Sequence, residues 1–382
     1  MVVATPKYLD ERDELMNLAG RLSGVTSLGL GDPDHATPAH IVVAAREAIT
    51  DGRCDHYTDP AGLPELRQAI AAKLSRDNGI CADPDTEITV TTGGQEGLYL
   101  IIQCLLNPGD EILVQDPRYS SYDAAIKRAG AVGVPLPTRQ EDDFNLDPDV
   151  VAARITPRTK ALLLITPGNP TAGIITPENL QAIAALAIAH DLIVICDEIY
   201  EKFTYDGARH LSIGSLPGMQ GRTITLGGFS KAYAMTGWRL GYVAAPAALT
   251  SAIRHLKEIV SVCAPLPSQW AGVAALTGPQ DCVDYFRATY DDRRRALMRA
   301  LTDCGFTYGH PYGAFYIFAN TTTTGLPAFE LARRLLLEGR VLVFPGTGFG
   351  EGWKDYLRFS LVQPTPVLLD ALDRLRAVVG VR

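Results

Sequence analysis

Residues 223–242 read TITLGGFSKAYAMTGWRLGY and place a lysine, Lys231, among glycines, small residues and aromatics. The run TITL that precedes it is apolar and β-branched, which indicates a buried strand, so Lys231 follows the end of a strand. The stretch holds no carboxylate that could neutralise the ammonium group. A lysine that is desolvated at such a place has a lowered pKa and can act as a nucleophile. The stretch therefore predicts an α/β protein with chemistry at a strand end.

The sequence around this stretch alternates short apolar runs with segments of helix length. Between about residues 86 and 245, EITVTT is followed by QEGLYLIIQCLL, DEILVQ by SSYDAAIKRAG, and ALLLIT by PENLQAIAALAIAHD, and the runs LIVICD, TITLGG and LGYVAAP complete the set. Strands that are apolar on both sides and are joined by helical crossovers form mostly parallel sheets with helices on both faces. We therefore expect an α/β fold whose site is formed by residues that follow the strands.

Beyond about residue 280 the pattern changes to that of a smaller α+β unit. A long helical segment, VDYFRATYDDRRRALMRAL, is followed by the expected strand AFYIFA, the helix PAFELARRLLLEG and the expected strands VLVFPG and YLRFSLV. A chain of 382 residues is long enough for about two domains. Because no Pro/Ser-rich linker, repeat or low-complexity tract separates the two parts, we expect them to pack together.

Composition and charge narrow the classes of protein. The formal net charge is -8, and runs of like charge are short and mixed in sign, which is unlike a nucleic-acid-binding surface. The N-terminus lacks a signal-peptide pattern, and no apolar run reaches the ~18 residues of a membrane span, so we expect a cytoplasmic protein that binds neither nucleic acid nor membrane. The cysteines form no C-x-x-C pair and the histidines show no H-x-x-x-H spacing, which predicts reduced thiols and no metal site.

Polar residues follow several of the expected strands. The turn TTGGQEG carries Gly93, Gly94 and Gln95 at the start of a helix, where backbone N–H groups can hold an anion; a simple strand-to-helix turn is the alternative. Asn169 lies in the Pro/Gly-rich turn ITPGNPTAG, where turn chemistry is the alternative to a binding role. Asp197 ends the run IVICD, and a carboxylate at the edge of the core needs a partner unless it caps the following segment.

Two arginines have apolar or glycine-rich surroundings. Arg239 lies eight residues after Lys231, between Trp238 and Leu240, a setting that suits bidentate binding of phosphate or carboxylate, with a structural ion pair as the alternative. Arg358 is embedded in the strand pattern YLRFSLV, so it needs an anion or points to solvent. The amine, the carboxylate, the phenol that follows it and the anion-binding groups together suit a phosphorylated pyridine aldehyde.

A set of motifs runs along nearly the whole chain: LGLGDPDHATP, YTDPAGLPELRQAI, NPGDEILVQDPRYSSY, NPTAG, DEIY, SKAYAMTGWRLGY, PGTGFG and LRFSLV. In content, order and spacing they resemble the class I and II aminotransferases, the pyridoxal-phosphate enzymes of fold type I. SKAYAMTGWRLGY looks like the family's cofactor-lysine motif. The joint match is far more specific than any one of the motifs.

The resemblance implies that pyridoxal 5'-phosphate is the cofactor and that Lys231 forms a Schiff base with its aldehyde. An incoming amino acid displaces the lysine, whose freed amine then acts as the general base. Asp197 matches the carboxylate that keeps the pyridine nitrogen protonated. Tyr200 and Asn169 match the residues that donate to the phenolic oxygen, and Tyr119 matches the aromatic residue that stacks on the ring.

The resemblance also assigns groups to the cofactor phosphate. Arg239 matches the arginine that binds it. Tyr57 matches a tyrosine that reaches the phosphate from the neighbouring subunit, which implies a homodimer with shared active sites. The other residues implied at the phosphate are Gly93, Gly94, Gln95 and Ser230.

Substrate binding and domain organisation follow from the same resemblance. Arg358 matches the arginine that binds the substrate α-carboxylate, together with Asn169 and the backbone of Gly31. The large cofactor-binding domain is expected to span 46–280, and the small domain to combine 1–45 with 281–382. Closure between the two would exclude water from the site.

Three positions leave questions open. NPTAG has alanine, Ala172, where glycine is common in the family, so the local backbone shape is in question. His35 takes a position often held by an aromatic residue, and it either contacts substrate or is a loop histidine. Gln95 lies near where some relatives have a basic residue, which weakens an assignment to aspartate.

The leading interpretation is an aminotransferase that moves an amino group from an L-amino acid, of aspartate or aromatic type, to a 2-oxo acid such as 2-oxoglutarate by a ping-pong mechanism. A carbon–sulfur β-lyase on the same fold is the alternative, because it would keep the same site residues and divert the same carbanion to elimination. A third reading is a non-catalytic cofactor-binding regulatory module. Such modules carry an additional N-terminal DNA-binding region, and this acidic chain starts almost directly at the first motif.

Overall fold

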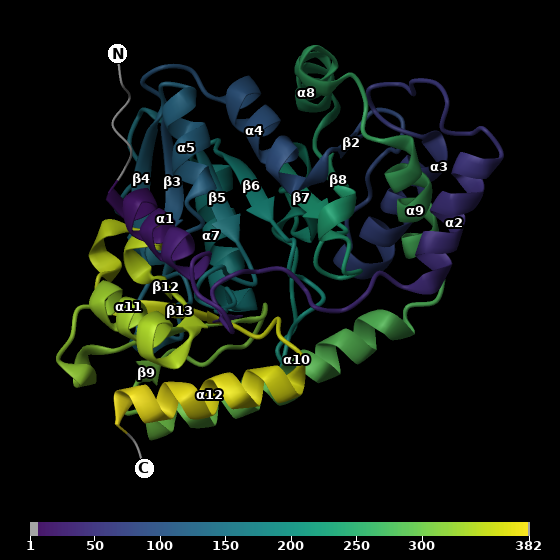
Figure 1. The fold of residues 1–382 in the computed structure, drawn as a ribbon. Coiled ribbons are helices and arrows are strands. Elements are labelled where there is room, and N and C mark those ends of the chain that lie inside the picture. Colours follow the sequence, from purple (N-terminus) through teal and green to yellow (C-terminus); the bar gives the residue numbers. More distant parts are fainter. Residues whose placement is uncertain (1–6, 381–382) are drawn as a thin grey trace, which may run out of the picture.

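The computed structural model describes residues 7–380, and its centre is a seven-stranded sheet in the order β2-β8-β7-β6-β5-β3-β4 (Figure 1). β8 pairs antiparallel with both β2 and β7, whereas the other neighbouring strands are parallel. The expected mostly parallel sheet is therefore confirmed, with a reversed strand near one edge. The strands are β2 (Ile88–Thr91), β3 (Glu111–Asp116), β4 (Val132–Pro137), β5 (Thr159–Ile165), β6 (Ile193–Asp197), β7 (Thr223–Gly228) and β8 (Gly241–Ala244).

Helices cover both faces of this sheet because its central strands are apolar on both sides. Along β5, Ala161, Leu163 and Ile165 pack on one face, and Leu162 and Leu164 pack on the other. The first face is covered by α4 (Gly93–Leu105) and α5 (Ser121–Arg128), and the second by α6 (Pro148–Ala152) and α7 (Pro177–Ala189). α8 (Ala247–Ser261) packs on α4.

A further group of helices surrounds the edge formed by β2 and β8. α9 packs against both α2 and α3, and their apolar residues form one core with Ile88, Val90 and Tyr242 of these strands. The helices are α2 (Ala39–Thr50), α3 (Pro64–Lys73) and α9 (Leu266–Thr277).

The C-terminal part forms a second, antiparallel sheet in the order β12-β13-β10-β9. Its strands are β9 (Thr307–Tyr308), β10 (Tyr316–Asn320), β12 (Phe344–Pro345) and β13 (Tyr356–Ser360). The long helices α10 (Asp281–Asp303) and α12 (Thr365–Val379) lie side by side beneath it, and α11 (Ala328–Gly339) packs on α12 (Figure 1). This arrangement agrees with the α+β pattern expected beyond residue 280.

The N-terminal segment joins the C-terminal part. α1 (Lys7–Ala19) packs on α11, and β1 (Thr26–Ser27) pairs in parallel with β11 (Val341–Leu342). The run VLVFPG, expected as one strand, is therefore divided, because β11 pairs with β1 and β12 with β13. The chain then passes to α2 and the large sheet.

The division into domains stays a prediction. Position 46 lies inside α2, a continuous helix that packs on α9, whereas position 281 coincides with the start of α10. We therefore propose that the first boundary falls ahead of α2 rather than within it.

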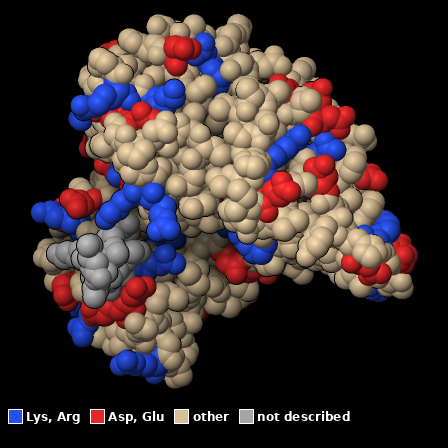
Figure 2. Space-filling model, turned by 90° about the horizontal axis from the view of Figure 1, so that it is seen from above, with Lys and Arg blue, Asp and Glu red and all other residues tan. Residues whose placement is uncertain are grey.

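One face of the molecule has a surface of mixed charge. The face that Figure 2 shows carries Lys/Arg and Asp/Glu side chains in small groups of both signs, separated by uncharged surface. Across residues 7–380, no helix is both long enough and apolar enough to cross a bilayer.

Candidate active site

A cavity of about 440 Å³ lies where the ends of β5, β6 and β7 meet the second sheet. Residues from the N-terminal segment, the large sheet and the C-terminal part all contribute to its wall. The sequence-predicted residues that line it are Gly31, Gly94, Gln95, Tyr119, Asn169, Asp197, Tyr200, Ser230, Lys231, Arg239 and Arg358. The fold thus brings together side chains that are far apart in the sequence.

Lys231 follows β7 and extends into this cavity. Its Nζ donates to the backbone oxygen of Gly31 at 2.6 Å and lies 5.7 Å from the centre of the Phe315 ring. Burial lowers the pKa of Lys231 to about 8; Asp32 opposes this shift, and the Arg358 guanidinium adds to it. A larger share of the amine is therefore neutral, and nucleophilic, near neutral pH than for an ordinary lysine.

Asp197 is the last residue of β6 and is 9 % exposed. Its Oδ2 accepts a hydrogen bond from the Tyr122 hydroxyl at 2.8 Å, and its Oδ1 accepts from the Ile199 amide at 3.2 Å. Burial raises the pKa of Asp197 to about 6, while both hydrogen bonds act in the opposite direction. The Ile199 contact is the local cap that the sequence offered as an alternative, but the carboxylate also lines the cavity.

Tyr200 and Tyr316 form a pair of phenols at the wall. Their hydroxyl oxygens are 3.1 Å apart, and either can donate. Tyr316 comes from β10 and lies over Gly31 so closely that a Cβ at residue 31 would be 1.9 Å from its hydroxyl oxygen. Glycine at position 31 is therefore required by the close approach of these two segments.

Arg358 in β13 is held by one hydrogen bond from each of its two Nη atoms. Its Nη1 donates to Asn169 Oδ1 at 2.9 Å and its Nη2 to the Gly29 carbonyl, whereas its buried Nε has no hydrogen-bond partner in the described part of the chain. The guanidinium carbon lies 4.4 Å from the Tyr316 ring centre, and burial lowers the pKa of Arg358. A buried guanidinium at a cavity wall fits a carboxylate ligand.

The other end of the cavity has the features of an anion site. Gly93 and Gly94 begin α4, and a Cβ at Gly93 would be 2.5 Å from Arg239 Nη2, so glycine allows the guanidinium to lie against the helix N-terminus. Arg239 Nη1 donates to the Thr236 carbonyl at 2.9 Å. The Thr92 side chain makes no capping bond to any described residue, so the first-turn N–H groups remain for a ligand.

Two residues considered from the sequence lie elsewhere. Tyr57 is 83 % exposed and lies outside the cavity wall, so it can act at a phosphate only in a neighbouring molecule. His35 also lies outside the wall and stacks on Phe286 at 4.1 Å, and burial lowers the pKa of this imidazole.

Tyr122, Tyr316 and Arg12 are among the wall residues that were not predicted from the sequence. Tyr122 comes from α5, where it lies on the buried face with Ala125 and Ile126, and Tyr316 comes from β10, where it belongs to an apolar run. Arg12 comes from α1 and lies with its guanidinium 5.2 Å from the centre of the Phe344 ring. It is one charge in the run DERDE, which reads as a solvated helix face.

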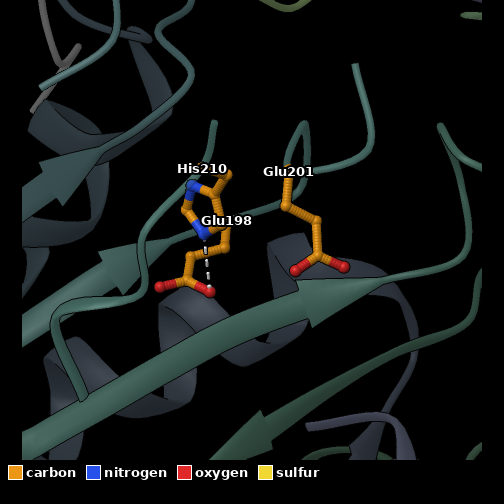
Figure 3. A group of neighbouring side chains, drawn as sticks. All are labelled: Glu198, Glu201 and His210. Carbon is orange, nitrogen blue, oxygen red and sulfur yellow. Dashed lines mark ion pairs between the residues drawn. The ribbon is translucent and has the colours of Figure 1, made fainter. Parts of the chain in front are cut away.

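A cluster of two carboxylates and a histidine lies next to β6 and has the composition of a metal site. Ligand atoms of Glu198, Glu201 and His210 lie within 4.8 Å of one another, and Nε2 of His210 lies 3.1 Å from Glu198 Oε2 (Figure 3). Asn78 Nδ2 donates to Glu198 at 2.9 Å and to Glu201 at 2.6 Å, and Lys73 forms an ion pair with Glu201. Protein donors therefore occupy the space between these carboxylates, and the cluster is a buried ion-pair network.

Comparisons with known proteins agree with this geometry. The family model described as aminotransferase class I and II matches residues 23–375. The chain is 40% identical to an aspartate aminotransferase from Pyrococcus abyssi over 96% of this chain and 94% of that protein. It is 39% identical to aromatic-amino-acid aminotransferase 2 from Thermococcus litoralis, with the same coverage.

Solved structures give the same result. The aromatic aminotransferase from Pyrococcus horikoshii OT3 superimposes with a TM-score of 0.91 at 41% identity, covering 96% of this chain and 98% of that one. The aspartate aminotransferase from Thermus thermophilus with maleate gives 0.91 at 37% identity, covering 98% and 97%. The chain therefore belongs to the class I and II aminotransferase family and is an enzyme that transfers amino groups.

Proposed function

We propose that the cavity binds pyridoxal 5'-phosphate and that the enzyme uses it to move an amino group from an L-amino acid to a 2-oxo acid. The observation that carries the proposal is Lys231, a lysine whose pKa is lowered to about 8, between a buried carboxylate and an anion-binding helix end. An amine, a carboxylate and an anion site are the groups that an aldehyde, a pyridine nitrogen and a phosphate need.

The residues present fit this cofactor. Lys231 would hold the aldehyde carbon, and Asp197 would accept a hydrogen bond from the pyridine nitrogen, which its negative charge keeps protonated. Arg239 and the N-terminus of α4 would hold the phosphate, together with Ser230. When bound, the cofactor supplies an electron-accepting ring that stabilises negative charge at the substrate Cα. Tyr119 supplies an aromatic face at the cavity wall.

The protein's own groups would then orient the substrate and move its proton. Arg358 binds the α-carboxylate through a planar fork, which fixes the Cα–H bond relative to Lys231. The Lys231 amine would remove that proton from Cα and deliver it to the carbon that was the cofactor's aldehyde carbon, because its lowered pKa allows it to act as both base and acid near neutral pH. Tyr200 and Asn169 offer polar groups on the side of Arg358.

We propose that the acceptor is a dicarboxylic 2-oxo acid such as 2-oxoglutarate, and that donors are of aspartate or aromatic type. Arg12 supports this because it adds a guanidinium to the wall besides Arg358 and Arg239, which are assigned to the α-carboxylate and the phosphate. Phe344 and Phe349 lie at the same wall and suit aromatic side chains. The Thermus thermophilus relative was solved with maleate, a dicarboxylate, and other relatives are named for aspartate or aromatic amino acids.

We also propose a homodimer with shared active sites. Tyr57 supports it, because this large side chain is 83 % exposed in a single chain and has no contact with its own cavity. Tyrosine is one of the residue types that are enriched at protein–protein interfaces.

The test is to add single L-amino acids, without any oxo acid, to the protein loaded with pyridoxal 5'-phosphate and to follow the cofactor absorbance. The proposal expects conversion to the amine form of the cofactor and one equivalent of 2-oxo acid, fastest with the true donors. A spectrum that persists while pyruvate and ammonia accumulate from cysteine-type substrates would instead establish the β-lyase reading. A spectrum unchanged by the whole panel would favour the binding module.

The dicarboxylate assignment has its own test, Arg12→Met. We expect kcat/KM for dicarboxylic substrates to fall about tenfold or more, because a charge-assisted contact to the distal carboxylate is lost, and kcat/KM for aromatic donors to change little. Arg21→Met is the matched control, because Arg21 is exposed beyond the end of α1 and lies outside the cavity wall. Equal losses for both substrate classes would contradict the assignment.

A further inference from the structure

A fully buried lysine lies behind the anion site and takes no part in the mechanism above. Lys257 in α8 is 0 % exposed and lies outside the cavity wall. Its Nζ is 3.3 Å from Glu96 Oε2 and donates to the Ser261 hydroxyl at 2.8 Å. A buried ammonium group is costly unless it is paired, so its carboxylate partner indicates why the charge is there.

That partner belongs to the first turn of α4. Glu96 Oε2 accepts a hydrogen bond from the Thr92 amide at 2.6 Å, so it bends back over the start of the helix much as a capping carboxylate does. The side chain thereby satisfies the amide ahead of the helix and leaves those of Gly94 and Gln95 for a ligand. The same carboxylate, however, places negative charge at the helix end that the cofactor phosphate would occupy.

Charge balance at this helix end therefore depends on Lys257. Without it, the attraction that Arg239 and the helix N-terminus exert on a dianion would be reduced by repulsion from Glu96. With it, Glu96 keeps its structural hydrogen bond to Thr92 while its charge is compensated from the side facing away from the cavity.

We propose that Lys257 is a positioning residue for the phosphate group: it neutralises Glu96 and holds it on the Thr92 amide, so that the N-terminus of α4 retains its affinity for a phosphate dianion. The inference rests on the proposed function, because the phosphate is that of the cofactor. It adds a determinant that lies on α8, behind the helix that forms the site, and that touches neither cofactor nor substrate.

The test compares two aldehydes that differ only in the phosphate. Dissociation constants of pyridoxal 5'-phosphate and of unphosphorylated pyridoxal are measured by absorbance for the cofactor-free parent protein, Lys257→Met, Glu96→Gln and the double variant. We expect Lys257→Met to weaken pyridoxal 5'-phosphate about tenfold and to leave pyridoxal unchanged, since only the phosphate meets the uncompensated carboxylate. Glu96→Gln keeps an oxygen for Thr92, so it should bind pyridoxal 5'-phosphate at least as tightly as the parent.

The double variant separates charge compensation from packing. It should bind pyridoxal 5'-phosphate within about twofold of the parent, because both opposing charges are removed together. Lys202→Met is the matched control: Lys202 forms an ion pair with Asp77 at 2.6 Å, and both residues lie outside the cavity wall, so neither aldehyde should respond.

Several outcomes would overturn the inference. They are equal weakening of both aldehydes in Lys257→Met, a double variant as weak as the single one, and weaker binding of pyridoxal 5'-phosphate by Glu96→Gln. If Lys257→Met does not fold, the Glu96→Gln and double-variant results still decide. A parent protein that binds no pyridoxal 5'-phosphate would instead contradict the proposed cofactor, which distinguishes that failure from this one.

Discussion

Burial lowers the pKa of Lys231, and this shift sets the pH at which its amine can react with an aldehyde. Because the pKa is lowered to about 8 from 10.5, the amine is half neutral near pH 8 and becomes protonated as the pH falls. We expect the rate at which cofactor-free protein captures pyridoxal 5'-phosphate to rise about tenfold per pH unit below this value and to level off above it. Stopped-flow absorbance between about pH 6 and pH 10 measures this profile.

Lys231→Ala is the control for that profile. It should remove the covalent absorbance band and turnover while leaving the two sheets intact, because residue 231 follows β7 and does not have a positive φ. A rate in the parent protein that still rises through about pH 10 would mean that Lys231 titrates like an exposed lysine, and turnover in Lys231→Ala would remove it from the mechanism.

Substitutions of Arg358 and Arg239 test whether one end of the cavity binds the substrate carboxylate and the other binds the cofactor phosphate. Lysine keeps the charge of Arg358 but loses the planar fork, so Arg358→Lys should lower kcat/KM for amino acids by about 10- to 100-fold while cofactor affinity survives. Arg239→Lys should show the opposite pattern, with weaker cofactor binding and a nearly unchanged KM. Titration of the loaded protein with an unreactive substrate analogue measures the first effect directly, and unaltered analogue affinity in Arg358→Lys would contradict its role.

At the scale of elements, the segment between β1 and α2 is held against β10 with no free space at Gly31. A methyl group at residue 31 would meet the Tyr316 hydroxyl oxygen at 1.9 Å, so Gly31→Ala must displace either the segment or the phenol. We expect a fall in kcat/KM of about 100-fold, because the displaced segment carries the carbonyl that Lys231 contacts. Steady-state kinetics and thermal unfolding of the variant measure the two consequences.

The double variant Gly31→Ala/Tyr316→Phe supplies the internal control. Removal of the hydroxyl leaves the ring carbon Cζ as the nearest atom, at 3.0 Å from the added Cβ, so part of the lost activity should return. If the double variant is as impaired as the sum of the two single ones, the close approach is not the cause.

Sequence patterns predicted the strand ends because a buried parallel strand reads as an unbroken apolar run. Asp197 and Lys231 follow such runs and were found on that ground, and the motif resemblance added Tyr119 and Ser230. Tyr122 and Tyr316 could not be found in this way, since a tyrosine on the apolar face of a helix or within an apolar strand has the pattern of a core residue. The direction of β8 could not be predicted either, because nothing in LGYVAAP indicates that this strand runs antiparallel to its neighbours.

Ala172, the alanine of NPTAG that stands where glycine is common, is subject to a backbone cost and a burial gain of similar size. Ala172 has φ +59°, in the left-handed region where glycine costs less by about 1 kcal/mol. Its methyl group, however, is fully buried, which is worth about 0.8 kcal/mol. The two contributions nearly offset each other, so the turn that carries Asn169 tolerates alanine.

At the scale of the whole molecule, the site exists only when distant parts of the chain are assembled. Its wall runs from Arg12 in α1 to Arg358 in β13. The carbonyl of Gly29 is bound by Arg358 of the second sheet, and that of Gly31 by Lys231, which follows β7 of the large sheet. The N-terminal segment therefore links the two parts of the molecule through the same side chains that are proposed to bind substrate and cofactor. Removal of Lys231 or Arg358 should consequently loosen this segment as well as the chemistry.

Mixing subunits tests whether the site extends to a second chain. Lys231→Ala and Tyr57→Ala are each purified, mixed and exchanged under mild denaturant. If Tyr57 acts in the neighbour's cavity, a hybrid dimer contains one site with an intact Lys231 and an intact partner tyrosine, so about a quarter of all sites become fully active. The mixture should then exceed the sum of the two separate activities. Parent protein exchanged with an equal amount of the Lys231→Ala/Tyr57→Ala double variant should instead lose about half of its activity, because the site that keeps Lys231 in each hybrid lacks the tyrosine of its partner. Hybrids that form, as shown by a charge tag on one subunit, but restore no activity would place Tyr57 outside the partner's site.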